Sequence, residues 1–411
     1  MYKKLLLVLS FFYLSAFAFS QGTVFQYARQ IVDTMASESM HGRGYVNDGD
    51  KIAANYLKNE FQKIGLKSFQ EGYYQKFNFP INTFPSKMYV AIDGKELVPG
   101  KDYIVSERSG SGKGEYLLKK YTSNAEGFVD VPKKDKRYAV VVDDSKKELI
   151  RQLSKGPIVY VTNKKLTQDL EWNYFNVPAI KLVDSIIPKD AKKIKVDIMN
   201  KFIPKYESQN VIGYIPGAVY PDSFIVFSAH YDHLGQMGSK VYFPGANDNA
   251  SGCAMLLNLA KYYSLPENKP RYSIVFIAFA GEEVGLLGSD YFTKKPLFPL
   301  TKIKFVFNMD IMGTGEEGIT VVNGSVFKTE FDKLKQINSD NKYIKDVKIR
   351  GKAANSDHYH FSEKGVKAFF IYTMGGIKAY HDIYDRPETL PLNEFENLFK
   401  LITQFGSYLQ N

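Results

Sequence analysis

The chain has 411 residues, long enough for two or three domains, and its 44% hydrophobic and 24% charged content is ordinary for a globular protein. The formal net charge is +10. The lysines are scattered, without a basic stripe interleaved with stacking aromatic residues, which argues against nucleic-acid binding and for a solvated basic surface. The single cysteine, Cys253, excludes an internal disulfide.

The first twenty residues have the pattern of a secretory signal peptide. Lys3 and Lys4 form a charged start, residues 5–19 are apolar, and small residues at 18 and 20 offer a cleavage site. A membrane anchor is the alternative, but the apolar stretch is short for a span of about 20 residues. We therefore predict that residues 1–20 are removed, that no membrane anchor remains, and that the protein is exported to the periplasm or the extracellular medium.

Residues 21–85 are predicted to form a helical N-terminal part of the main domain. One helix is expected over residues 23–36. A second is expected to begin at Asp50, which would cap it, and to end at Gly65. The apolar face of this second helix comprises Ile52, Ala53, Tyr56, Leu57, Phe61 and Ile64.

Residues 86–200 differ in character from the segments on either side. Short alternating stretches separated by many turns predict a strand-rich core, and this part of the sequence has no cluster of residues that commonly bind metals. We interpret it as a separate inserted domain.

In residues 201–411, predicted strands alternate with predicted helices. The continuous apolar run over 272–280 favours a central strand covered on both faces. This alternation predicts a three-layer α/β/α domain with a mainly parallel central sheet. The strands are expected at 223–229, 272–280, 305–309 and 368–372, and the helices at 249–263 and from 391 onward.

Acidic and histidine residues follow these hydrophobic runs one after another. A carboxylate at the tip of a buried strand is costly unless a cation or hydrogen bonds compensate it. In open α/β sheets, ligands bind at the carboxyl ends of the strands, so distant segments can converge there. We predict a metal site with two cations, and the nitrogen and oxygen ligands suit zinc. The candidates are His230, Asp232, Asp248, Glu282, Glu283, Asp310 and His381.

Each motif also has a structural interpretation. His230 and Asp232 could be a buried pair that closes a strand, and Asp248 could cap the helix that follows it. Glu282 and Glu283 could be exposed residues at the start of a helix. Because adjacent extended residues face opposite ways, one of the two could instead bind metal while the other acts as a base.

Four further histidines bear on the choice of ligands. His358 and His360 could replace one of the predicted ligands, whereas His41 and His233 are interpreted as structural or surface residues.

Taken together, the motifs resemble a known family. The strings AHYDHLG, GANDNASG, FAGEEVGLLGS, NMDIMG and YHDIYD make residues 209–411 similar to the catalytic domain of the di-zinc aminopeptidases of metallopeptidase family 28. Residues 86–200 resemble a protease-associated domain more weakly, through the string VPAIKL and their position.

This resemblance implies a secreted zinc-dependent exopeptidase that removes N-terminal residues from peptides. Two zinc ions per chain are expected, with one water activated between them. The implied roles are His230 and Asp310 on one zinc, Glu283 and His381 on the other, Asp248 as the bridge, Glu282 as general base, Asp232 as the residue that orients His230, Tyr380 as the group that polarises the substrate carbonyl, and Asp357 as a residue behind the ligands.

Three alternatives remain at this point. A carboxypeptidase-type member would read a terminal carboxylate, for which Arg350 and Arg386 are the candidates. A glutaminyl cyclase on the same fold would use a single zinc. A binding module would be expected to lack ligands or the base.

Overall fold

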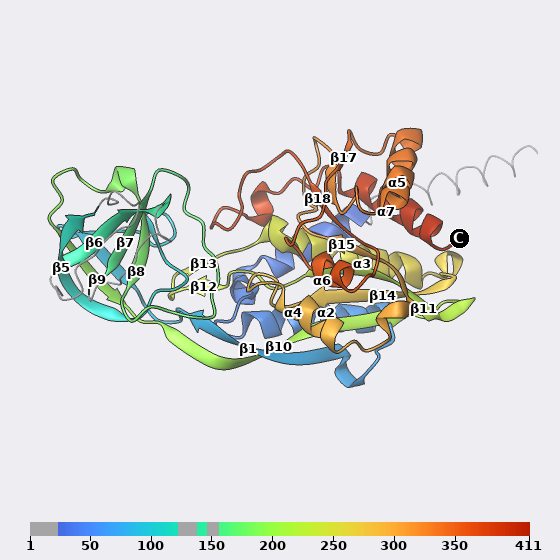
Figure 1. Cartoon of the computed structure of the whole chain (residues 1–411), viewed down its shortest axis with the longest axis horizontal. Coiled ribbons are helices and arrows are strands. Elements are labelled where there is room, and N and C mark those ends of the chain that lie inside the picture. The colour runs from blue at the N-terminus through green and yellow to red at the C-terminus, as the bar shows by residue number, and fades with distance from the viewer. Residues whose placement is uncertain (1–23, 122–137, 146–155) are drawn as a thin grey trace, which may run out of the picture.

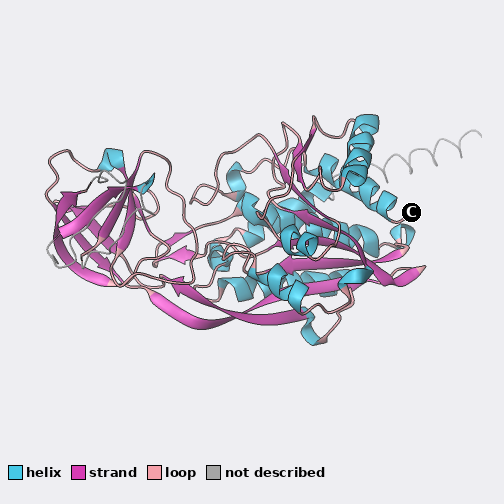
Figure 2. Cartoon of the chain, viewed as in Figure 1, coloured by secondary structure: helices cyan, strands magenta, loops and turns pink. Residues whose placement is uncertain are grey.

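The computed structural model describes residues 24–121, 138–145 and 156–411, so the predicted signal peptide lies outside the described residues. The described chain forms two large sheets joined by a long two-stranded ribbon, with helices gathered around one of the sheets (Figures 1 and 2). Within these residues, no helix is both long enough and apolar enough to cross a membrane.

The main sheet has eight strands, and its four central strands run parallel to one another. The strands beside this group, β10 and β16, pair with it antiparallel. The α/β class predicted from the alternation of strands and helices is thus confirmed. In spatial order the strands are β1 (Tyr74–Thr83), β10 (Lys201–Ile215), β14 (Tyr272–Phe279), β11 (Tyr220–His230), β15 (Ile303–Met309), β18 (Ala368–Thr373), β16 (Ile319–Val322) and β17 (Val347–Ile349).

Side chains that alternate along the central strands build a core on each face of this sheet. Phe227 of β11 and Phe276 of β14 belong to the larger core, with α2 (Gly49–Ile64), α3 (Ser251–Ser264), α5 (Lys328–Asn341) and α7 (Phe395–Leu409). Their neighbours Val226 and Val275 face the opposite way, toward α4 (Leu287–Lys294) and α6 (His358–Glu363). Because successive residues of a strand point to opposite faces, this alternation produces the three layers.

Helix α2 departs from its predicted details at its N-terminus. Its N-cap is Asp48, and Asp50 lies inside the first turn with its carboxylate buried, so the predicted cap at Asp50 is wrong. The polar partners that Asp50 needs are supplied by strand β10. Ile52, placed on the buried face by the helical pattern, is instead 38% exposed. Gly65 ends the helix as predicted, in the left-handed conformation that glycine adopts without strain.

The second sheet lies within the stretch that was predicted as an insert. Its eight strands come in the spatial order β3 (Lys95–Glu96), β2 (Tyr89–Ile92), β9 (Lys193–Ile198), β5 (Gly112–Lys120), β6 (Tyr138–Asp143), β7 (Ile158–Thr162), β8 (Ala179–Val183) and β4 (Tyr103–Val105). We call it the inserted sheet.

The ribbon of β1 and β10 leads into and out of the inserted sheet (Figure 1). The two strands pair antiparallel from Tyr74 opposite Val211 to Thr83 opposite Lys201. The core of the inserted sheet continues into Leu234 and Phe243, which belong to the segment after β11. The inserted sheet therefore packs against the region where the candidate metal residues lie.

Candidate metal centre

The predicted site residues meet at the carboxyl ends of the central strands. His230 is the last residue of β11, and Asp310 directly follows β15. Glu282 and Glu283 lie in the turn just beyond β14. Since these strands are parallel neighbours in the sheet, their ends bring the four side chains to one edge.

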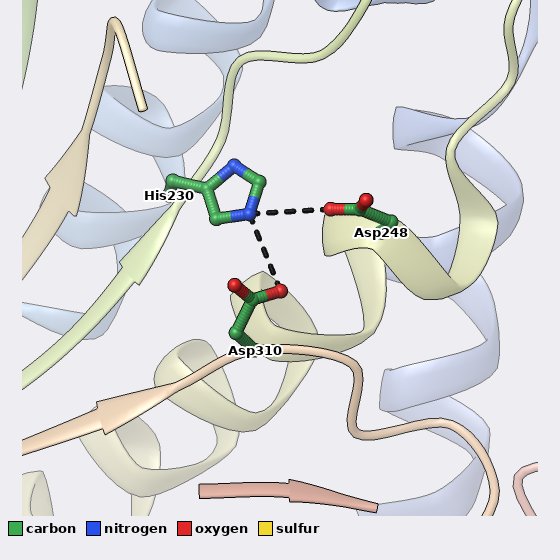
Figure 3. A group of neighbouring side chains, drawn as sticks. All are labelled: His230, Asp248 and Asp310. Atoms are coloured by element: carbon green, nitrogen blue, oxygen red, sulfur yellow. Dashed lines mark ion pairs between the residues drawn. The ribbon is translucent and has the colours of Figure 1, made fainter. Parts of the chain in front are cut away.

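One half of the centre is built around His230. Its Nε2 atom lies 3.2 Å from Asp248 Oδ1 and 3.3 Å from Asp310 Oδ1 (Figure 3). All three residues are buried and offer their ligand atoms within 4.8 Å of one another. Asp310 Oδ1 accepts no hydrogen bond. A buried carboxylate oxygen in this position is the kind of group that a cation would satisfy.

The other half is built around His381. Its Nε2 atom lies 3.0 Å from Glu283 Oε2 and 3.3 Å from Asp248 Oδ2. Asp248 therefore directs one oxygen at each histidine and stands between the two halves. The five predicted ligands thus converge as two sets of nitrogen and oxygen donors that share one carboxylate.

The loop that carries Asp248 is shaped for this position rather than for helix capping. Asp248 has an extended backbone, and it is Asn249 whose Oδ1 accepts hydrogen bonds from the backbone N–H groups of Gly252 and Ile311. The carboxylate of Asp385 accepts the backbone N–H of Asp248 at 3.0 Å. Asn249 thus satisfies the start of α3 and leaves the Asp248 carboxylate free to face the two histidines.

Asp232 supports the centre through two different groups. Its backbone carbonyl lies 3.2 Å from His230 Nδ1, while its carboxylate is farther away, at 3.7 Å. The carboxylate accepts the hydroxyl of Tyr45 at 2.8 Å and the backbone N–H groups of Glu282 and Glu283, each at 3.3 Å. The carbonyl is thus the nearer acceptor for His230, and the carboxylate holds the Glu282–Glu283 turn.

The remaining predicted residues surround this core. Glu282 is half-buried beside it. Tyr380 is 45% exposed and stacks on His381, with ring centroids 4.0 Å apart. Asp357 is fully buried, and that burial raises the pKa of its carboxyl to about 7.

Crowding of buried acids drives the pKa values of this site in opposite directions. Burial raises the pKa of Glu282, and the negative charges of Asp310 and Glu283 add to the rise. Burial also opposes the charge of Asp248, but hydrogen bonds from His230 and His381 outweigh it and hold that pKa well below its usual range. The positive charge of His381 likewise overcomes burial at Glu283 and lowers its pKa to about 2. Such a cluster is electrostatically balanced only by positive charge, from protonated histidines or from metal ions.

Several residues whose roles the sequence left undecided lie away from the centre. His358 packs against Phe370, with ring centroids 5.4 Å apart, and His360 faces Asp290 at 3.6 Å, so neither joins the ligand set. Arg350 donates to the hydroxyl of Tyr372. Arg386 donates to the carbonyl of Ile383 and lines a surface hollow with Arg29 and Asp33.

His233, which was interpreted from the sequence as a structural or surface residue, lies within the centre. It is fully buried, and its Nδ1 atom lies 2.6 Å from Glu283 Oε1. It forms a second compact group with Asp248 and Glu283. We regard His381 as the better ligand, because its Nε2 atom reaches oxygens of both acids, whereas the short contact of His233 occupies the other oxygen of Glu283. The spacing H-x-D-H in AHYDHLG was the available signal.

Comparison with known proteins places this site in a family. Residues 210–406 match the profile of Peptidase family M28. The segment that holds all of the predicted ligands therefore belongs to peptidase family M28, and the chain is a metallopeptidase.

Similar proteins extend beyond this segment. Aminopeptidase YwaD of Bacillus subtilis is 25% identical over 384 residues, which cover 86% of this chain and 77% of that protein. A probable leucine aminopeptidase of Trichophyton verrucosum is 27% identical, over 67% of this chain and 79% of its own length.

Among solved structures, the zinc aminopeptidase BSAP of Bacillus subtilis superposes with a TM-score of 0.70 at 18% identity, over 93% of this chain and 94% of that chain. A peptidase M28 precursor from Shewanella amazonensis gives a TM-score of 0.69 at 15% identity, over 96% and 97% of the two chains. The fold, including the inserted sheet, is thus shared across nearly the whole chain.

Proposed function

We propose that the protein is an exported aminopeptidase that hydrolyses the first peptide bond of peptides with two zinc ions. The roles are those expected from the sequence: His230 and Asp310 hold one zinc, Glu283 and His381 hold the other, Asp248 bridges them, Glu282 is the general base, and Asp232, Asp357 and Tyr380 support the site.

The observation that carries this proposal is the position of Asp248. Its Oδ1 and Oδ2 atoms lie 3.2 and 3.3 Å from the Nε2 atoms of two different histidines, His230 and His381. A carboxylate that serves a single cation would not need a second imidazole on its other oxygen. Histidine and carboxylate together form a donor set that suits zinc.

Zinc in such a site supplies Lewis acidity toward a carbonyl oxygen and lowers the pKa of water. The protein then has to move one proton. Glu282 is held beside the centre by the Asp232 carboxylate, which accepts its backbone N–H. In this proposal Glu282 takes a proton from the attacking water and delivers it to the nitrogen of the leaving amine. Tyr380, which is half-exposed and stacks on His381, is proposed to donate a hydrogen bond from its hydroxyl to the substrate carbonyl.

The positions of the two candidate arginines favour an amino terminus as the end that is recognised. The two arginines considered for carboxylate binding donate elsewhere, to Tyr372 and to the Ile383 carbonyl. The names of the Bacillus subtilis and Trichophyton verrucosum relatives support the same polarity.

Export rests on the charged and apolar pattern of residues 1–20. Expression of the full chain followed by fractionation should yield a product that begins at Gln21 outside the cytoplasm. A full-length product retained with the cytoplasmic fraction would contradict this part of the proposal.

Metal content and substrate choice test the catalytic part together. The panel contains aminoacyl-nitroanilides, their N-blocked counterparts, N-blocked peptides with a free carboxylate, and a glutaminyl peptide scored for ring closure. We expect about two zinc ions per chain and release from the unblocked substrates only. Release from N-blocked peptides with a free carboxylate would indicate a carboxypeptidase, and one zinc with ring closure would indicate a glutaminyl cyclase.

A further inference from the structure

A loop that leaves the inserted sheet reaches directly into the metal centre. Residues 165–169, which follow β7, lie against the loop 378–382 that carries His381. Asp169 Oδ1 lies 3.2 Å from His381 Nδ1, and the backbone N–H of Gln168 donates to the His381 carbonyl at 2.8 Å. We call residues 165–169 the clamp segment.

Lys165 also contacts the loop 378–382. Its Nζ atom donates to the carbonyls of Lys378 and Tyr380, at 2.8 and 3.0 Å, and to Asp382 Oδ2 at 2.8 Å. The Asp382 side chain is 7% exposed, so this ion pair is partly shielded from water. Together with Gln168, Lys165 holds the carbonyls of two consecutive residues, Tyr380 and His381.

His381 needs such support because its backbone is strained. Its φ angle is +53°, in the left-handed region that side chains other than glycine rarely adopt. A residue stays in this conformation only when its surroundings impose it. The hydrogen bonds from Lys165 and Gln168 act on the peptide groups on either side of this residue, and the contact with Asp169 acts on its ring.

We propose that the inserted domain contributes to the metal centre, because its residues Lys165 and Asp169 position His381. This inference rests on the proposed role of His381 as a zinc ligand. An acceptor at Nδ1 would fix the ring and the tautomer, so that Nε2 faces Glu283 and Asp248 and its lone pair is free for the zinc that these residues would hold. Loss of the clamp would release the ring and weaken the zinc on this side while leaving the His230 side intact.

The chain offers closely matched variants for a test. Lys165→Met and Asp169→Ala remove the two clamp side chains, and Asp169→Glu restores a carboxylate. Two controls match them. Lys164→Met makes the same substitution at the neighbouring exposed lysine, and Asp190→Ala removes an exposed aspartate elsewhere in the inserted domain. Each mature, full-length protein is stripped of metal and titrated with zinc against a chromogenic chelator. Thermal unfolding and the separate values of kcat and KM are recorded in parallel.

We expect Lys165→Met and Asp169→Ala each to lower the affinity for the second zinc about tenfold. This is the lower end of the effect expected for residues that orient a metal ligand, because the Asp169 side chain is half-exposed. The first zinc should bind as in the unmodified protein. The kcat should fall at limiting zinc with little change in KM, and Asp169→Glu should recover most of the affinity. Lys164→Met and Asp190→Ala should be unaffected.

Zinc titrations of Lys165→Met and Asp169→Ala that superimpose on the parent protein would overturn the proposal. An equal loss in Lys164→Met or Asp190→Ala would overturn it as well, because the effect would then not depend on the clamp. His381→Ala separates this inference from the function proposed above. If His381→Ala keeps both zinc ions at parental affinity, the ligand assignment itself fails. If it loses one and the clamp variants do not, only the clamp fails.

Discussion

The two halves of the metal centre are built in different ways. His230 and Asp310 sit at the ends of neighbouring parallel strands, β11 and β15, inside the main sheet. His381 sits on a loop with a strained backbone and takes support from another sheet through Asp169 and Lys165. The first half is thus fixed by regular secondary structure, whereas the second also contacts the loop that follows β7 of the inserted sheet.

This difference suggests which half can be lost without the other. Strand ends are held by backbone hydrogen bonds and by cores on both faces of the sheet. The His230 half should therefore keep its geometry when residues of the inserted sheet and its loops are substituted. The His381 half should respond to changes in the inserted sheet. Asp248, whose carboxylate contacts both histidines, links the two halves directly.

The largest expected effect therefore belongs to Asp248→Ala. Removal of the shared carboxylate should reduce the content of both zinc ions and lower kcat/KM by roughly 10⁴-fold or more, because both ions are needed for the metal-assisted step. Metal analysis after gel filtration, beside peptidase assays, checks this. Unchanged zinc stoichiometry in this variant would show that Asp248 does not bridge. Asp33→Ala, at an exposed position outside the ligand groups, is the control.

Glu282→Gln should separate proton transfer from metal binding. The amide keeps the shape of the side chain but cannot accept a proton, so kcat should fall roughly 10²–10⁴-fold. Both halves of the centre should keep their zinc. If the metal is lost together with the activity, Glu282 is a ligand and the roles of Glu282 and Glu283 are reversed. Glu96→Gln, at an exposed position in strand β3 of the inserted sheet, should behave as the parent protein.

His233→Ala tests the support behind Glu283 in the second half. The variant loses the 2.6 Å contact with Glu283 Oε1, so the second zinc should bind about 10- to 100-fold more weakly while the first is retained. His360→Ala is the matched control, because that ring faces Asp290 and lies outside the ligand groups. Complete loss of one zinc in His233→Ala but not in His381→Ala would exchange the roles of the two histidines.

The half of the metal centre that lies at strand ends could be predicted from the sequence. Periodic apolar runs ended where β11, β14 and β15 end, and polar residues at those ends predicted a site at one sheet edge. The physical rule used there is local: a strand end and the residue after it are adjacent in the chain.

The support of the other half could not be derived in the same way. Asp169 and His381 are 212 residues apart, and no periodic pattern connects an exposed loop of one sheet with a loop beside another. The sequence left open whether His233 is structural or lies at the surface, because a single histidine in a loop gives no indication of its burial. The capping role of Asn249 rather than Asp248 depends on backbone angles that the residue types did not fix.

A further contact network lies behind the His230 half. Tyr45, which donates to the Asp232 carboxylate, packs edge-on against Tyr206. Tyr206 and Ser208 of β10 in turn donate to the buried carboxylate of Asp50, at 2.5 and 2.7 Å. Burial outweighs these hydrogen bonds and raises the pKa of Asp50 to about 7.

Asp50 should therefore make global stability depend on pH while the strand-built half of the centre stays intact. A carboxyl group whose pKa is about 7 when folded and about 3.9 when unfolded binds more protons in the native state between those values, so stability falls as pH rises from about 4 to about 7. The loss is at most about 4 kcal/mol. In Asp50→Asn this pH dependence should shrink, as measured by urea unfolding of metal-free protein at pH 4.5, 6 and 7.5. Asp48→Asn, in which an exposed carboxylate paired with Lys51 is removed, should keep the parental pH profile. Parallel profiles for Asp50→Asn and the parent protein would mean that Asp50 ionises in the native state as it does in the unfolded chain.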